Sequence, residues 1–282
     1  MGGEHDTRAA WEARSQLYGA SLRSVLFQGL PERVNAHLHQ WHTQFLLRHI
    51  VPKPHLRILD IGCGFGRLTL PILQQCPDAE VLGVDISLTF VDLFRQTTLQ
   101  NALVGSLDAL PPDIGPFDYI ICVTVLMYVE TQQLQEAMRN LVRLLRPEGL
   151  LLLIENDFLG FCCSVGPLTC VQRALRKKPS ATPAHLFRRR TVRMLVEGSG
   201  AVVRHQRGLP FTTVCLVPLA FFFAYCPQFF VHDVCLRLLT WLDRACGSLA
   251  LPSLYRGYVI AQSSSHTTPS REREAEWSPK KR

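Results

Sequence analysis

Residues 58–66 read Ile-Leu-Asp-Ile-Gly-Cys-Gly-Phe-Gly and decide the expected fold of this chain. A short apolar strand leads into a turn in which Gly62 and Gly64 let the backbone come close to a ligand. The helix that follows presents its N-terminal N–H groups at the same place, which favours a nucleotide-like guest. The stretch therefore predicts a cofactor loop at the end of a strand.

This loop differs from the dinucleotide fingerprint G-x-G-x-x-G, because Arg67 occupies the place of the third glycine. Asp60, at the end of the strand, would repel a pyrophosphate and attract a cationic ligand. The next strand ends at Asp85, whose carboxylate can accept both hydroxyls of a ribose. A positively charged adenosine without phosphate, such as S-adenosylmethionine, fits both carboxylates, and an NAD-dependent oxidoreductase fits them poorly.

Short apolar runs alternate with stretches of helical spacing from residue 53 onward, which is typical of strand-helix-strand units. We expect a Rossmann-like, mostly parallel seven-stranded α/β sheet with helices on both faces. The expected strands are 57–61, 80–85, 101–105, 117–124, 150–155, 201–207 and 256–262. The expected helices between them are 66–75, 88–99, 134–145 and 191–198.

Residues 55–157 resemble the class I S-adenosylmethionine-dependent methyltransferases, and in particular the small-molecule and quinone-type members of the type 11 kind. The motifs that carry the resemblance stand in family order and spacing. They are Asp-Ile-Gly-Cys-Gly at 60–64, Asp85, Gly-Ser-Leu-Asp-Ala-Leu-Pro at 105–111, Phe-Asp-Tyr at 117–119 and Leu-Leu-Arg-Pro-Glu-Gly at 144–149.

The resemblance implies S-adenosylmethionine as the cofactor and assigns its site, with no metal. Gly62, Gly64 and Phe65 would line its methionine and ribose end, Asp85 would hold the ribose, and Ile86 would pack on the adenine. Ser106 stands where the family usually has an Asp that receives the adenine amino group, and either its hydroxyl or Asp108 would serve instead. The whole expected cofactor set is Asp60, Gly62, Gly64, Phe65, Asp85, Ile86, Ser106, Leu107 and Thr124.

Acceptor groups should follow the fourth and fifth strands, since ligands lie beyond the carboxyl ends of parallel strands. If the acceptor starts protonated, the candidate bases are Tyr128, Asp157, His185 and His205, none of them preferred. Asp157 has a second reading as the cap of the helix after it. The expected function is methyl transfer to an apolar small-molecule or lipid-like acceptor. The alternatives are a catalytically silent methyltransferase-fold binding protein and a methyltransferase acting on protein or RNA.

Two insertions are expected, at 158–190 and 208–254. Residues 171–210 hold ten basic residues against one acid, Glu197, which indicates either an anion-binding patch or a solvated helix face. No RNA-binding module is recognisable, so nucleic acid is the less favoured partner. Residues 208–231 carry no charge, and we weigh an apolar cap over the acceptor pocket, docking at a membrane interface through 208–242, a membrane span and ordinary core.

The remaining expectations concern the ends of the chain and its location. Residues 1–52 should form two helices that break at Gly29-Leu30-Pro31, residues 53–262 the methyltransferase domain, and residues 263–282 a disordered tail. We expect no secretory leader, and the ten cysteines contain no Cys-x-x-Cys pair. Reduced thiols and a cytoplasmic protein, peripheral on a membrane in one alternative, are therefore expected.

Overall fold

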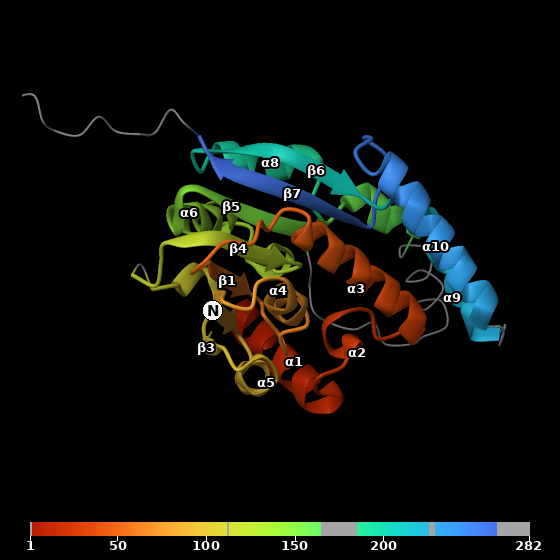
Figure 1. Ribbon diagram of the computed structural model, residues 1–282, viewed down its shortest axis with the longest axis horizontal. Coiled ribbons are helices and arrows are strands. Elements are labelled where there is room, and N and C mark those ends of the chain that lie inside the picture. The colour runs from red at the N-terminus through yellow and green to blue at the C-terminus, as the bar shows by residue number, and fades with distance from the viewer. Residues whose placement is uncertain (1, 112, 165–184, 226–228, 264–282) are drawn as a thin grey trace, which may run out of the picture.

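A seven-stranded sheet forms the centre of the molecule (Figure 1). The computed structural model describes residues 2–111, 113–164, 185–225 and 229–263. The strands lie in the order β3-β2-β1-β4-β5-β7-β6. Their bounds are β1 Arg57–Ile61, β2 Glu80–Asp85, β3 Asn101–Val104, β4 Phe117–Val123, β5 Leu145–Asn156, β6 Ala201–Gly208 and β7 Tyr255–Gln262.

The first five strands pair in parallel, and β7 runs antiparallel to both of its neighbours, β5 and β6. Every residue of β4 is buried, as the continuous apolar run of a strand covered on both faces requires. β1 lies between β2 and β4, so the strand order reverses there and opens a crevice at the carboxyl ends of these strands. The expected fold class is confirmed.

Helices cover both faces of the sheet, and each face has its own apolar core. One core joins α3 (Glu32–Leu47), α4 (Thr69–Gln75) and α5 (Leu88–Thr98) to the sheet. The other core joins α6 (Leu134–Arg143) and α8 (Arg189–Glu197) to the opposite face. Short 3₁₀ turns, η1 (Leu107–Ala109) and η2 (Leu126–Tyr128), follow β3 and β4.

The fifth strand begins at Leu145, earlier than the expected 150. Phe117 pairs with Leu145 and Tyr119 with Leu150, so the register between β4 and β5 shifts here. The shift accommodates the Pro-Glu-Gly segment at 147–149, which the sequence predicts as the end of a helix. A β-carbon on Gly149 would lie 2.9 Å from the carbonyl oxygen of Phe117, which explains why glycine stands there. The helix before it accordingly ends at Arg143.

The N-terminal segment contains three helices rather than the expected two. They are α1 (Gly2–Tyr18), α2 (Leu22–Val25) and α3, and the expected break at 29–31 precedes α3. The additional break follows Gly19, whose φ of 52° lies in the left-handed region that ends helices. Leu17, one of the apolar residues behind the helix prediction, is 72% exposed because α1 turns another face toward α5.

The apolar insertion before β7 is a helical hairpin of α9 (Pro210–Tyr225) and α10 (Phe229–Cys246). Figure 1 shows it at one end of the molecule, beside α3. His37 of α3 and Thr212 of α9 join the hairpin to the body through a hydrogen bond of 2.9 Å. Within the part of the chain that the structure describes, no helix has both the length and the apolar character needed to cross a bilayer. The expected tail and most of the 158–190 insertion lie outside the described residues.

Candidate active site

A large cavity opens where β1, β2 and β4 end, at the crevice that the strand order creates. Its space, with the open mouth included, is ≈ 1350 Å³. Thr7 and Trp11 of α1 and Val25 of α2 are part of its wall. The lining residues are Thr7, Trp11, Val25, Ile61, Gly62, Cys63, Gly64, Arg67, Leu68, Val84, Asp85, Ile86, Phe90, Gly105, Ser106, Leu107, Val123, Thr124, Val125, Tyr128, Val129, Glu130, Gln133 and His185.

The glycine loop forms the floor of this cavity. Gly62 and Gly64 have φ values of 67° and 53°, a conformation that strains residues with a side chain. The backbone N–H groups of Gly62 and Cys63 both donate to the carbonyl oxygen of Val84, which ties the loop to the end of β2. Glycine is therefore required here by the turn itself, as the sequence pattern indicates.

Replacing Gly62 with alanine should weaken cofactor binding at least about tenfold. The added β-carbon would lie 2.4 Å from Cγ2 of Val125, another cavity wall, and the left-handed backbone adds strain. Isothermal titration calorimetry with S-adenosylmethionine measures the effect. Gly29→Ala is the matched control, because a β-carbon there meets no atom within 4 Å. Equal affinity for both variants would show that the loop does not form the binding floor.

Asp85 ends β2 with its carboxylate at the cavity. Oδ2 accepts a hydrogen bond from the N–H of Gly64 and Oδ1 one from the N–H of Ser87, each at 2.9 Å. Burial raises the pKa of Asp85 to about 6, although these hydrogen bonds act to lower it. A carboxylate has about four acceptor positions, so two remain for the hydroxyls of a ribose.

Part of the cavity wall is apolar. Ile86, Phe90 and Leu107 line it together with Ser106, and the resemblance assigns the adenine to this part. The side chain of Asp108, the alternative partner of the amino group, lies outside the described residues. The glycine floor, the carboxylate with spare acceptor positions and this apolar slot together fit the parts of S-adenosylmethionine.

Two residues of the expected cofactor set do not reach the cavity. Asp60 is buried beneath the loop and accepts a hydrogen bond of 2.7 Å from Oγ1 of Thr69, so it anchors the start of α4. Burial raises the pKa of Asp60 to about 6. Phe65 is buried in the turn and does not line the cavity, whereas Arg67 and Leu68 do. The roles that the resemblance assigns to these two residues remain predictions, and the structure places both side chains in the buried support of the loop.

Of the four candidate bases, only Tyr128 and His185 line the cavity. Burial raises the pKa of Tyr128 to about 12, so its hydroxyl is a proton donor at neutral pH. His185 is exposed at the cavity mouth, and its backbone N–H donates to the carbonyl oxygen of Met127 at 2.7 Å.

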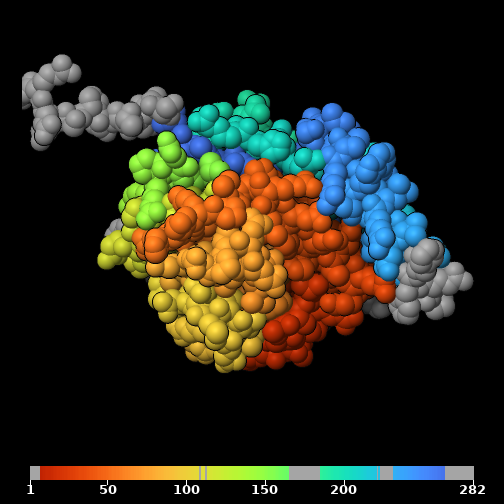
Figure 2. All heavy atoms as spheres, viewed as in Figure 1, coloured from red at the N-terminus to blue at the C-terminus, as the bar shows by residue number. Residues whose placement is uncertain are grey.

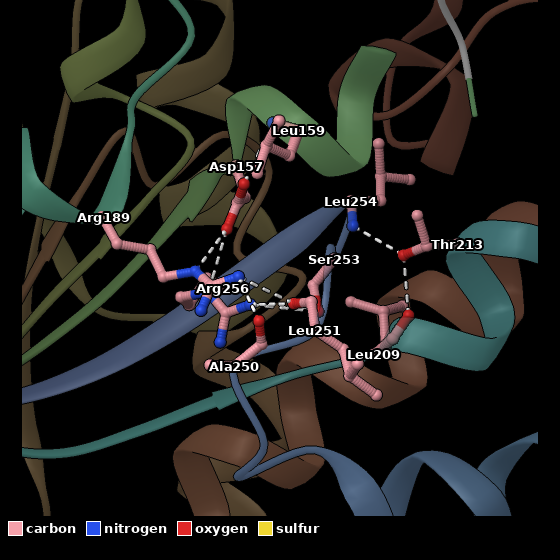
Figure 3. A network of polar contacts seen from close by, with 10 residues as sticks. All are labelled: Asp157, Leu159, Arg189, Leu209, Thr213, Ala250, Leu251, Ser253, Leu254 and Arg256. Atoms are coloured by element: carbon pink, nitrogen blue, oxygen red, sulfur yellow. Dashed lines mark hydrogen bonds and ion pairs between the residues drawn. The ribbon is translucent and has the colours of Figure 1, made fainter. Parts of the chain in front are cut away.

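Asp157 and His205 do not line the cavity. Asp157 caps the helical turn that follows it, through Leu159 N–H to Oδ1 at 3.1 Å, as its second reading proposed. Its other oxygen forms ion pairs with Arg189 and Arg256, at 3.3 and 3.0 Å (Figure 3). His205 lies on β6, with its ring 5.6 Å from that of His49. Both positions depend on the tertiary arrangement of β6 and β7.

The N-terminal helix supplies site residues that sequence reasoning missed. Trp11 lines the cavity and meets Tyr128 edge to face, with ring centroids 5.3 Å apart. Glu12 accepts hydrogen bonds from the hydroxyls of Ser87, at 2.7 Å, and Thr89, which fastens α1 to the N-terminus of α5. An acidic side chain stabilises a helix when it lies at the helix N-terminus. Glu12 belongs to α1 and lies at the N-terminus of α5, so no local sequence pattern predicts its position.

Glu155 is a second missed residue, at the end of β5. It is 1% exposed, and its Oε1 accepts from the N–H groups of Val125 and Leu126 at 3.0 and 2.8 Å. It therefore holds the turn after β4 that carries Thr124, Val125 and Tyr128 to the cavity. Oε2 is buried and forms no hydrogen bond with any residue that the structure describes. Burial raises the pKa of Glu155 to about 8.

Glu155→Gln should make the protein more stable than the wild type at pH 9. A carboxyl whose pKa is higher in the folded than in the unfolded state destabilises the fold as pH rises from 4.5 through about 8. The amide keeps an acceptor for the two N–H groups and removes the titration. Melting temperatures of both proteins between pH 5 and 9 provide the test, and curves that stay parallel over this range would contradict it.

Comparison with known proteins identifies the class of domain to which this fold and cavity belong. Residues 58–149 match the family model described as a methyltransferase domain. The chain therefore contains a class I S-adenosylmethionine-dependent methyltransferase domain, and the resemblance, the enzyme class and the cofactor expected from the sequence are confirmed.

Individual relatives share this domain. The chain is 30% identical to an uncharacterized methyltransferase, C1B3.06c, of Schizosaccharomyces pombe over 144 residues, 45% of this chain and 50% of the relative. It is 33% identical to the tRNA N(3)-methylcytidine methyltransferase Mettl2 of Drosophila melanogaster over 106 residues, 34% of this chain and 33% of the relative. The match thus spans half or less of each relative's length.

A solved structure shares the fold over almost the whole chain. Magnesium protoporphyrin IX methyltransferase (ChlM) from Synechocystis PCC 6803, solved with bound SAH, superposes with a TM-score of 0.57 at 17% identity. The superposition covers 93% of this chain and 100% of that chain. At this level of identity the likeness concerns the fold.

Proposed function

We propose that this chain transfers the methyl group of S-adenosylmethionine to an apolar small-molecule or lipid-like acceptor. The observation that carries the proposal is the composition of the cavity wall. Trp11, Val25, Tyr128 and Val129 contribute aromatic and aliphatic surface to it. Such a wall favours an apolar guest through the hydrophobic effect.

The residues of the chain would divide the work between binding and alignment. Asp85 and the glycine loop hold the ribose end of the cofactor, and Ile86 and Leu107 pack on its adenine. When bound, S-adenosylmethionine supplies an electrophilic methyl group. Methyl transfer then requires an aligned acceptor and exclusion of water, which α1 and Trp11 provide by closing the cavity.

Proton handling would fall to the two cavity-lining candidates. His185 at the mouth can accept a proton from an acceptor hydroxyl or amine, whereas the hydroxyl of Tyr128 stays protonated and can orient the acceptor by donating a hydrogen bond. His185→Gln should then lower the rate of methyl transfer.

The test is incubation of the purified chain and methyl-labelled S-adenosylmethionine with fractionated cell extract. The proposal expects label in the organic-soluble fraction, and none with Asp85→Ala. Calorimetric binding of S-adenosylmethionine without any labelled product or released demethylated cofactor would favour the silent binding protein instead.

An RNA acceptor is the second candidate, because the Drosophila relative is named as a tRNA methyltransferase and the surface around α8 carries exposed Arg190 and Arg193. Adding purified tRNA to the same assay distinguishes the RNA acceptor from the apolar small-molecule or lipid-like acceptor. Label that appears in tRNA and is absent from the organic-soluble fraction would replace the first proposal with the second.

A further inference from the structure

The α9–α10 hairpin exposes apolar side chains in helical rows. On α10, Val234, Leu238 and Trp241 are 51%, 56% and 63% exposed and lie one above another along one side of the helix. On α9, Val214 and Phe222 are exposed at a spacing of eight residues, which also places them on one side. Rows of this kind on a soluble surface mark a place that meets a partner.

The charge beside the α10 row indicates the chemistry of that partner. Arg48, at the C-cap of α3, Arg207 of β6 and Arg244 of α10 form an arginine triad around a small groove floored by Trp41 and Phe45. Burial lowers the pKa of Arg48, and the charges of Arg207 and Arg244 lower it further, as expected for cations held close together.

Protein groups leave the charge of this triad uncompensated. Within the described ranges, none of its three arginines forms an ion pair with a carboxylate. Arg207 donates to the carbonyl oxygen of Arg244, and Arg244 donates to Oε1 of Gln44 at 2.9 Å. The one acid lining the groove, Asp243, is buried and accepts hydrogen bonds from the start of α9.

The apolar row and the triad lie on the same part of the molecule. Trp241 and Arg244 are one helical turn apart on α10, and both are exposed. Arg237 is exposed next to Leu238 and continues the positive flank along the helix. Figure 1 shows the hairpin at one end of the molecule, and Figure 2 shows α10 on the surface there.

We propose that the exposed face of α10 and the arginine triad dock this protein on an anionic lipid membrane surface. Val234, Leu238 and Trp241 insert at the boundary of headgroups and acyl chains, while the arginines bind lipid phosphates. RNA phosphates could pair with the arginines, but the apolar row on α10 would then remain exposed to water, which is why we favour a lipid surface. The proposal is independent of methyl transfer, because none of the described side chains of α9 and α10 is among those that line the cavity.

Cosedimentation with vesicles tests the proposal. The wild-type chain should pellet with vesicles of phosphatidylcholine and phosphatidylserine and stay in solution with phosphatidylcholine alone. Leu238→Asp and the double variant Arg207→Gln/Arg244→Gln should each lower the bound fraction about fivefold or more. The matched controls are Met194→Asp, at an exposed apolar position of α8, and Arg143→Gln, at an exposed position of α6, and both should bind as the wild type does.

Calorimetric affinity for S-adenosylmethionine, which should be unchanged in all four variants, shows that each is folded. The absence of pelleting with anionic vesicles, or equal pelleting of controls and test variants, overturns the proposal. So does light scattering that finds a dimer broken by Leu238→Asp with no effect on vesicle binding, because the occupant would then be a second copy of the chain.

Discussion

Arg256→Met should destabilise the fold by about 3–5 kcal/mol, the largest effect we expect from a single substitution in this chain. Arg256 is fully buried on β7. Its Nε donates to Oδ2 of Asp157 at 3.0 Å, and its Nη2 donates to the carbonyl oxygen of Leu251 at 2.6 Å (Figure 3). Removing the guanidinium leaves a buried carboxylate whose only other ion-pair partner in the described part of the chain is Arg189.

A melting experiment at neutral pH measures this loss, and we expect a fall of about 10 °C or more. The matched control is Arg139→Met, because Arg139 and Glu136 form an ion pair on the exposed surface of α6, where about 0–1 kcal/mol is at stake. Similar melting temperatures for the two variants would show that the buried network contributes no more than a surface pair.

Asp85→Ala should weaken binding of S-adenosylmethionine about hundredfold. The substitution removes the acceptor proposed for the ribose hydroxyls, and it also removes the hydrogen bonds that the N–H groups of Gly64 and Ser87 donate to the carboxylate. The floor of the cavity therefore loses one of its ties to β2, while the hydrogen bonds from Gly62 and Cys63 to Val84 remain. Calorimetry measures the change, and Asp92→Ala is the control, because Asp92 pairs with Arg95 on the exposed side of α5.

The pH dependence of binding provides an independent check on Asp85. Burial raises its pKa to about 6, so the carboxylate gains a proton as the pH falls from 7 to 5 and becomes a weaker acceptor. Affinity of the wild-type chain should decline over that range, and Asp85→Asn should bind weakly with little pH dependence. A wild-type affinity that rises on acidification would contradict the ribose assignment.

The parts of the site that the sequence predicts well are those where a local pattern sets the geometry. Gly62 and Gly64 adopt the left-handed backbone that the turn after β1 requires. Asp85 is the last residue of β2, at the carboxyl edge of the sheet. Ile86 and Leu107 follow directly from the same edge. In each case the residue's position depends on one strand and the turn after it.

The expected site residues that do not line the cavity are those whose contacts come from elements far away in the chain. Asp60 and Asp157 carry the charge that a site would need, but Asp60 accepts a hydrogen bond from Thr69 and Asp157 forms ion pairs with the arginines of α8 and β7. His205 has the chemistry of a base and lies on an outer strand. Residue type and local spacing do not reveal which partner a buried charge will meet.

The sequence by itself determined the α/β class, the carboxyl edge of the sheet as the place of the site, and the cofactor loop. Short-range periodicity and the placement of glycines fix each of these strands and turns locally. Only the tertiary structure decided that Trp11 of α1 lines the cavity, that Glu12 fastens α1 to the start of α5, and that Glu155 holds the turn after β4. It also decided that the apolar insertion is a hairpin beside α3. These contacts join segments far apart in the chain, so their energies depend on packing and burial that no local pattern records.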